Sequence, residues 1–282
     1  MSGTLYVVAT PIGNLEDITL RALRVLREVN VIAAEDTRRT ARLLSHFEIS
    51  SPTISFHAHN ARSRVPQLVN RLEAGENIAV VTDAGTPGVS DPGLELVQAA
   101  IYKGIAVDPI PGASAPLTAL IASGFPMTPF TVLGFAPNRS KARKHWLLEA
   151  VKISHTFSFF EGPHRMRAML LDAVDIFGER PIVAGRELTK LHQEFIRGTA
   201  HELLKRISDP RGEFTLVVGP ATKDPRLNEI RRTDEEVAQE FWRLTESGAN
   251  SRREIVSELA RRSGRSAKEV YLVIERAKKL GV

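Results

Sequence analysis

Short apolar runs of strand length alternate with segments of helical apolar spacing along the first 123 residues of the chain. Parallel strands need a long crossover between them, and that crossover is usually a helix. The alternation therefore favours an α/β domain whose parallel, doubly wound sheet carries helices on both faces. We expect Asp17 to cap the first helix. The strand-like runs lie at residues 4–9, 31–34, 53–57, 78–81 and 105–110.

A Gly- and Pro-rich stretch interrupts the alternation near residue 125, and the same alternation resumes beyond it. Residues 219–226 contain two prolines and are typical of a linker, and the remainder of the chain has helical spacing. We therefore expect two α/β domains, residues 1–124 and 125–222, followed by a small helical C-terminal segment at residues 223–282. The strand-like runs of the second domain lie at residues 131–135, 156–160, 181–184, 194–197 and 214–218.

The composition excludes several kinds of site. The chain has no cysteine, which rules out disulfide frameworks, thiolate zinc sites and cysteine nucleophiles. Neither a membrane-spanning apolar run nor a signal-like N-terminus is visible, so we expect a cytoplasmic protein without a membrane partner. No spacing typical of metal ligands, such as HExxH, occurs, so we expect no metal site.

Charge is unevenly distributed along the chain. Residues 252–279 hold nine Lys and Arg against four Asp and Glu, whereas the rest of the chain holds 29 residues of each sign. A neutral body with a basic C-terminal segment suggests a polyanionic partner such as nucleic acid. A helical bundle with a charged, solvated surface would have the same pattern, so both interpretations stay open.

Polar clusters follow five of the strand-like runs. The longest is dense in Gly, Pro, Asp, Ser and Thr, and it is long for a connection between a strand and a helix. Ligands of open α/β sheets bind at the carboxyl ends of the strands. We therefore expect all five clusters at one sheet edge, around one crevice. They lie at residues 11–14, 35–39, 83–91, 111–114 and 161–165.

The expected crevice lacks the two common nucleotide-binding signatures. Neither GxxxxGK[ST] nor a GxGxxG after the first strand occurs, and residues 1–102 contain no lysine. A triphosphate held by a lysine is therefore disfavoured. A ligand with hydroxyls, an amino-acid part and an apolar ring, held largely by backbone groups, fits the composition better.

Charged residues in two clusters suit proton transfer and phosphate binding. Asp36 suits a helix N-cap as well as catalysis, whereas the adjacent guanidiniums of Arg38 and Arg39 suit a phosphate backbone. His164 has the side chain best suited to proton transfer near neutral pH. A histidine at a helix start is, however, more often a surface or capping residue.

Seven motifs resemble one known family: VATPIGNLEDITLRAL, AAEDTRRT, SFHAHN, TDAGTPGVSDPG, PIPGASAPLTAL, FFEGPHR and RELTK. Across residues 4–219 they look like the bacterial small-subunit (16S) ribosomal RNA cytidine 2′-O-methyltransferases of the tetrapyrrole-methylase superfamily. The resemblance implies two α/β domains with S-adenosylmethionine in the cleft between them. It also implies methylation of a ribose 2′-hydroxyl in the decoding-site RNA of the small ribosomal subunit, and a homodimer. The first loop, TPIGN, replaces the glycine-rich turn of the tetrapyrrole enzymes, which favours the RNA acceptor.

The resemblance also implies site residues. It carries the cofactor site onto Pro11, Ile12, Asp83, Gly85, Thr86, Val89, Ala113 and Ser114, and in the second domain onto Phe160, Gly185, Phe214 and Thr215. As the base that accepts the hydroxyl proton, our candidates are Glu35, Asp36, Glu161, His164 and Glu187. As phosphate-binding residues, our candidates are Arg38, Arg39 and Arg165, with Arg252 and Arg253 in the basic segment.

Two alternative functions remain open at this point. One is a small-molecule methyltransferase that acts on a tetrapyrrole, which would have a wide apolar cleft. The other is an RNA-binding assembly factor without catalytic activity, for which the basic C-terminal segment would carry the RNA affinity.

Overall fold

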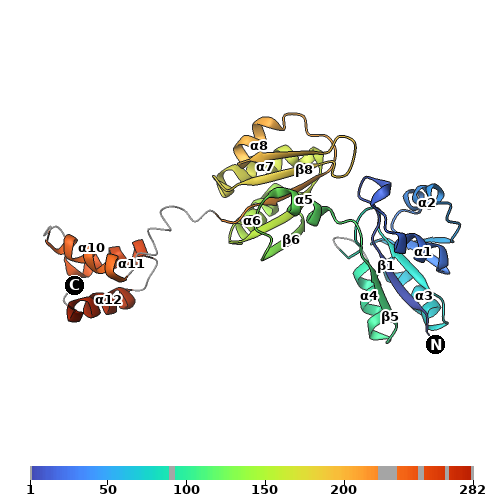
Figure 1. The fold of residues 1–282 in the computed structure, drawn as a ribbon, viewed down its shortest axis with the longest axis horizontal. Helices are drawn as coiled ribbons and strands as arrows, with labels where there is room; N and C mark the ends of the chain where they lie inside the picture. The colour runs from blue at the N-terminus through green and yellow to red at the C-terminus, as the bar shows by residue number, and fades with distance from the viewer. Residues whose placement is uncertain (1, 89–92, 222–233, 247–250, 264–266, 281–282) are drawn as a thin grey trace. The chain divides into compact units, whose positions relative to one another are not determined.

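The computed structural model describes residues 2–88, 93–221, 234–246, 251–263 and 267–280. The chain divides into two compact units, Met1–Pro220 and Ala221–Val282. The first unit contains two five-stranded sheets, and the second is helical (Figure 1).

The first sheet is entirely parallel, as the alternation predicts. Its strand order is β3-β2-β4-β1-β5. The third strand is shorter than predicted, because it ends before Phe56 and His57. The strands are β1 (Thr4–Val8), β2 (Val31–Ala34), β3 (Thr53–Ser55), β4 (Ile78–Val81) and β5 (Ala106–Ile110).

Helices cover both faces of this sheet, so β2 and β4 are buried along their whole length. On one face, α1 (Leu20–Glu28) and α2 (Thr37–His46) pack Leu26 and Leu44 against alternate strand residues such as Ile32. On the other face, α3 (Ala61–Glu73) and α4 (Gly93–Tyr102) contribute a second apolar cluster. In this doubly wound sheet, the loops that follow the strands lie together at the edge formed by the carboxyl ends of the strands.

The predicted cap of the first helix is wrong. The Thr19 hydroxyl, and not Asp17, accepts the hydrogen bond from the Ala22 N–H over 3.1 Å. Asp17 ends a separate 3₁₀ turn, η1 (Leu15–Asp17), whose own cap is Asn14. Threonine two residues further along the chain offers the same capping oxygen, so the pattern alone did not distinguish them.

The second sheet is mixed, with strand order β6-β7-β10-β8-β9. Only β6 and β7 are parallel, and the other neighbours are antiparallel. One face packs against α6 (Ser140–Ala150), α7 (Pro163–Phe177) and α8 (Ala200–Arg206), and the other packs against α5 (Ala115–Ser123). The strands are β6 (Phe130–Phe135), β7 (Thr156–Glu161), β8 (Ile182–Arg186), β9 (Glu194–Gly198) and β10 (Phe214–Val218).

The C-terminal unit consists of α10 (Asp234–Glu246), α11 (Arg252–Ser263) and α12 (Ala267–Leu280). Its own core includes Phe241 and residues from all three helices. The predicted breaks near Gly248 and Gly264 lie outside the described residues. Among the described helices of the chain, none is long and apolar enough to span a membrane.

Candidate functional site

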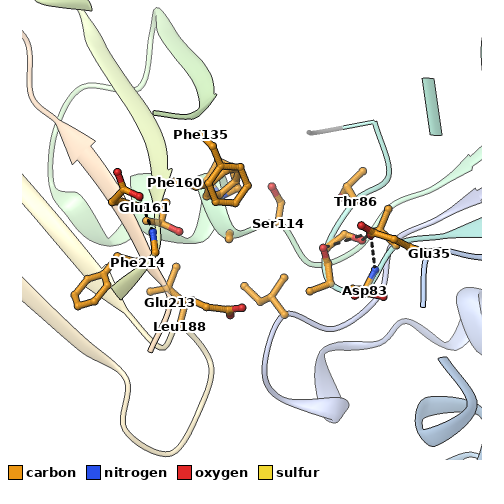
Figure 2. Close-up of a pocket in the computed structure, with 18 of the residues that line it drawn as sticks. Glu35, Asp83, Thr86, Ser114, Phe135, Phe160, Glu161, Leu188, Glu213 and Phe214 are labelled. Carbon is orange, nitrogen blue, oxygen red and sulfur yellow. Dashed lines mark hydrogen bonds between the residues drawn. The ribbon is translucent and has the colours of Figure 1, made fainter. Parts of the chain in front are cut away.

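A pocket of about 460 Å³ lies within the first unit, and residues from both sheets line it (Figure 2). We call it the central pocket. Its size falls within the range of small-molecule and cofactor sites. The lining residues are Ile12, Glu35, Arg39, Thr82, Asp83, Ala84, Gly85, Thr86, Ser114, Ala115, Pro116, Phe135, Phe160, Glu161, Gly162, Pro163, Leu188, Glu213, Phe214 and Thr215.

The expectation that five polar clusters share one sheet edge is wrong in one respect. The clusters after β1, β2, β4 and β5 follow parallel strands of the first sheet. The fifth cluster, residues 161–165, follows β7 of the second sheet. All five still contribute to the central pocket or its border, because the two sheets face the same cavity.

Backbone and carboxylate contacts fix the loops of the first sheet. Thr10 and Gly85 exchange two main-chain hydrogen bonds of 2.9 and 3.0 Å, which tie the first loop to the central loop. The Glu35 carboxylate accepts from the Asp83 N–H over 3.2 Å, and the Asp83 carboxylate accepts from the Asp36 N–H over 3.0 Å. Two carboxylates are therefore held side by side at the ends of β2 and β4.

The two arginines after β2 differ in what they contact. Asp36 caps α2 by accepting from the Arg38 N–H, and its carboxylate also binds the Arg38 guanidinium at 2.8 Å. These hydrogen bonds with Arg38 hold the pKa of the Asp36 carboxyl well below its usual range. Asp36 thus fulfils the capping interpretation, and neither residue lines the central pocket. Arg39 does line it, 3.5 Å from the Asp83 carboxylate.

Three residues expected in the second domain form one row across the second sheet. Thr215 of β10 is the cross-strand neighbour of Phe160 on β7 and of Gly185 on β8. Phe160 and Thr215 line the pocket, and Gly185 lies directly beside them. A Cβ at Gly185 would approach the Leu188 side chain to 2.9 Å, so the glycine leaves room for Leu188 on the pocket wall.

The next row of that sheet faces the helices. The Phe214 ring is 2% exposed and belongs to the core beneath α6, α7 and α8. The Glu161 side chain has no exposed surface, and it binds Arg165 at 2.5 Å and the Gly162 N–H at 2.8 Å. Burial raises the pKa of the Glu161 carboxyl, in spite of both interactions. Arg165 also donates to the Ala136 carbonyl, so both side chains are engaged within the second domain.

The other expected site residues lie at or beyond the border of the pocket. The Ala113 carbonyl accepts from the Thr86 hydroxyl over 3.1 Å, and Pro11 lines a side cavity of about 170 Å³. His164 is exposed on α7, and the Glu187 carboxylate binds Lys190 at 2.9 Å; neither lines the central pocket. Val89 lies outside the described residues.

The loop that carries Glu187 in the second domain contacts the first loop of the first domain. The Asn14 N–H of the first loop donates to the Thr189 hydroxyl over 3.0 Å. Gly13 packs so closely here that a Cβ would lie 2.5 to 2.7 Å from Lys190, Leu188 and Thr189. This close contact holds the first loop against the second domain beside the pocket.

Sequence reasoning missed Phe135, Leu188 and Glu213 as lining residues. Leu188 lies in the RELTK motif, which pointed to its charged neighbours. Phe135 is the last residue of β6, and Glu213 directly precedes β10. None of the seven motifs includes Phe135 or Glu213, so the sequence carried no signal for these two residues.

The chemistry of the walls fits the expected cofactor. Figure 2 shows Glu35 and Asp83 on the wall from the first sheet, opposite the rings of Phe135 and Phe160. Carboxylates suit the ammonium and hydroxyl groups of S-adenosylmethionine, and the ring of Phe160, the less exposed of the two, suits its planar ring and sulfonium charge. Among the described residues, no group of three or more His, Asp and Glu is arranged to hold a metal ion.

Two of the candidate phosphate-binding residues, Arg252 and Arg253, belong to the basic C-terminal unit. The Arg252 guanidinium sits 5.5 Å from the centre of the Phe241 ring, and Arg252 is exposed. Arg253 lies on α11, and the description of the structure does not extend to its side chain.

Comparison with known proteins gives consistent results. The family model described as Tetrapyrrole (Corrin/Porphyrin) Methylases matches residues 4–204. "Ribosomal RNA small subunit methyltransferase I" of Halalkalibacterium halodurans is 50% identical over 218 residues, covering 77% of this chain and 75% of that protein. The protein of the same name in Micromonospora olivasterospora is 45% identical over 263 residues, covering 92% and 83%.

A solved structure shares the fold of the first unit. Uroporphyrin-III C-methyl transferase from Thermus thermophilus, complexed with S-adenyl homocysteine, aligns with a TM-score of 0.55 at 18% identity. The alignment covers 77% of this chain and 97% of that one. The two sheets of the first unit are therefore found together in a known fold.

Proposed function

The chain belongs to the tetrapyrrole methylase family, and on this basis we propose that it methylates ribosomal RNA of the small subunit, with S-adenosylmethionine as the methyl donor. The observation that carries the proposal is the central pocket, where carboxylates and aromatic rings from two domains meet. The relatives named as small-subunit ribosomal RNA methyltransferases cover most of the chain. We further propose that the acceptor is a cytidine 2′-hydroxyl in the decoding region.

The residues proposed to hold the donor come from both sheets. When bound, S-adenosylmethionine supplies an electrophilic methyl group on a sulfonium. On the side of the first sheet, Asp83 and Ser114 are suited to its polar groups, and the glycine at position 85 allows close backbone approach. On the side of the second sheet, Phe160 and Thr215 complete the wall. Such positioning can supply about 7–11 kcal/mol of a barrier.

Glu35 is our preferred candidate for the base that accepts the proton of the ribose hydroxyl. Of the five candidates, Glu35 and Glu161 line the central pocket, and the Glu161 carboxylate is buried on the helix-facing side with Arg165. Glu35 stands at the end of β2 with its carboxylate oriented by the Asp83 N–H. A well-placed base contributes roughly 10²–10⁴-fold to a rate.

The acceptor RNA is proposed to approach along the arginines of α2. Arg39 lines both the central pocket and the side cavity, and Arg42 lines the side cavity next to it. Guanidiniums at this border suit the phosphates that flank the reacting ribose. The reacting nucleotide would have to leave its stack to bring its sugar into the pocket.

We also propose that the protein acts as a homodimer in the cytoplasm, with the small ribosomal subunit or its RNA as the partner. The basic C-terminal unit is suited to additional phosphate contacts, because its exposed surface includes Arg252, Lys268 and Arg276. Such contacts would strengthen binding without selecting a sequence.

Incubation with tritiated S-adenosylmethionine tests the proposal. Free small-subunit RNA, assembled subunits and a tetrapyrrole are offered in separate reactions, and label on RNA is then mapped to a nucleotide and to base or sugar. We expect label on a cytidine 2′-oxygen in the decoding region. Label on a tetrapyrrole and not on RNA would identify a small-molecule methyltransferase, and RNA binding without any label would identify a non-catalytic RNA-binding protein.

A further inference from the structure

Phe135 presents an exposed aromatic ring at the central pocket. It is 57% exposed although it lines the pocket, and its ring contacts that of Phe160, with the centroids 5.1 Å apart (Figure 2). Phe160 is less exposed than Phe135 and belongs to the donor wall described above. The two rings therefore differ in depth, and Phe135 is the one that an incoming macromolecule can reach.

An irregularity in β6 points this ring at the pocket. Phe130, Thr131 and Val132 pair regularly with β7, but Phe135 then pairs with Phe160. Regular pairing would place Phe135 opposite Glu161, on the face that packs against the helices. One extra residue in β6 reverses that direction, and Gly134 supplies the left-handed conformation at a φ of 72°. Bulges next to functional sites commonly redirect a side chain in this way.

Two ion pairs brace the segment that follows the ring. Arg165, paired with Glu161, donates to the Ala136 carbonyl over 3.2 Å. Arg143 donates to the Asn138 carbonyl over 3.1 Å, and its pairing with Asp172 at 2.6 Å is nearly solvent-free. Both guanidiniums are thus used to hold backbone immediately after Phe135. The backbone that follows the ring is therefore fixed before any ligand arrives, which lowers the entropic cost of using the ring.

The surroundings of the ring suit a nucleotide. Arg139 and Lys141 follow it at the start of α6, and both are exposed. RNA-binding proteins hold unstacked bases on aromatic side chains and place cations near the adjoining phosphates. An exposed aromatic ring that is followed in the sequence by two exposed cations has both of these components.

We propose that Phe135 is the platform on which the nucleobase of the acceptor nucleotide stacks while its ribose lies in the central pocket. This inference rests on the proposed function, and it assigns base recognition to the second domain. Phe135 would be a binding residue for RNA and not for the donor.

Substitution of Phe135 separates RNA binding from donor binding. We would prepare Phe135→Leu and Phe135→Ala, with Phe135→Trp as the conservative variant. Phe130→Ala is the matched control, because Phe130 lies on the same strand before the bulge and does not line the pocket. The measurements are the affinity for fluorescently labelled decoding-region RNA without donor, the KM for that RNA, and the affinity for S-adenosylhomocysteine by calorimetry.

We expect Phe135→Leu and Phe135→Ala to weaken RNA binding and raise the KM for RNA by roughly 5- to 150-fold, the range for loss of one stacked base. S-adenosylhomocysteine affinity should stay within about twofold, and Phe135→Trp should restore RNA binding. The inference would be overturned if the Leu and Ala variants bound RNA as tightly as the wild type. It would also be overturned if they lost affinity for S-adenosylhomocysteine and not for RNA. A wild-type protein that transfers no methyl group to RNA would overturn the proposed function itself.

Discussion

The main-chain N–H of Asp83 donates a hydrogen bond to the Glu35 carboxylate across 3.2 Å. In return, the Asp83 carboxylate accepts from the N–H of Asp36, the residue after Glu35. The ends of β2 and β4 are therefore locked together by side chains that also line the central pocket. Each carboxylate accepts one main-chain hydrogen bond, so both side chains are oriented at the pocket wall.

Replacement of Glu35 by Gln should lower the single-turnover rate of methyl transfer by roughly 10²–10⁴-fold. The amide oxygen can still accept from the Asp83 N–H, so the loops should keep their arrangement. Affinity for S-adenosylhomocysteine, measured by calorimetry, should therefore change little. If the single-turnover rate is unchanged, Glu35 is not the base.

Replacement of Gly13 by Ala should disturb the contact between the first loop and the second domain. The added methyl group would meet the Leu188 carbonyl and the Thr189 hydroxyl at 2.7 Å each. Overpacking of this kind typically costs about 1–3 kcal/mol, measured as the loss in free energy of unfolding. The Ala variant of Gly162 is the control for stability, because its methyl group would meet no atom within 4 Å. Equal stability of the two variants would argue against a tight contact at Gly13.

The Glu161 carboxyl should make stability depend on pH. Burial raises its pKa from the ordinary value of 4.5, so the folded protein binds this proton more tightly than the unfolded chain does. The stabilisation from this group is present below pH 4.5 and is lost as the pH rises through the raised pKa. In Glu161→Gln the position does not titrate. Urea titrations measure the unfolding free energy of both proteins between pH 4 and pH 8. The value for the wild type minus the value for the variant should fall as the pH rises. If this difference rises instead, the pairing with Arg165 outweighs burial.

The pair between Arg143 and Asp172 should be far more sensitive than a surface pair. Their side chains are 6% and 11% exposed, so Asp172→Asn leaves a buried guanidinium without its charge partner. Losing one partner of a buried pair costs about 3–5 kcal/mol. The matched control is Glu28→Gln, which breaks an exposed pair with Arg24 at 2.9 Å and should cost less than about 0.5 kcal/mol. Urea denaturation of both variants measures the difference, and similar costs would contradict a structural role for the buried pair.

The first domain was predictable because its signals are local. Parallel strands buried on both faces, such as Ile78–Val81, have continuous apolar sequences, and the crossover helices between them have regular spacing. The loops after those strands must lie at one edge, so Asp83, Gly85 and Ser114 could be assigned to one crevice from their positions in the chain.

The rest of the site depends on contacts that leave no local signal. Antiparallel pairing in the second sheet decides that Phe160 and Thr215 share a face, while Glu161 and Phe214 share the opposite one. The direction of Phe135 depends on a single extra residue in β6. Charged motif residues such as Glu187 attracted the functional interpretation, whereas the structure uses that side chain to bind Lys190 within its own loop.

The central claim is that loops from both sheets build one donor site, and calorimetric titration with S-adenosylmethionine tests it most directly. Asp83→Asn changes the wall from the first sheet, and Phe160→Ala changes the wall from the second. We expect the wild-type protein to bind with a stoichiometry of one per chain, and we expect each substitution to weaken binding at least tenfold. The claim would be contradicted if the wild-type protein gave no heat of binding. It would also be contradicted if one of the two substitutions weakened binding and the other left it unchanged.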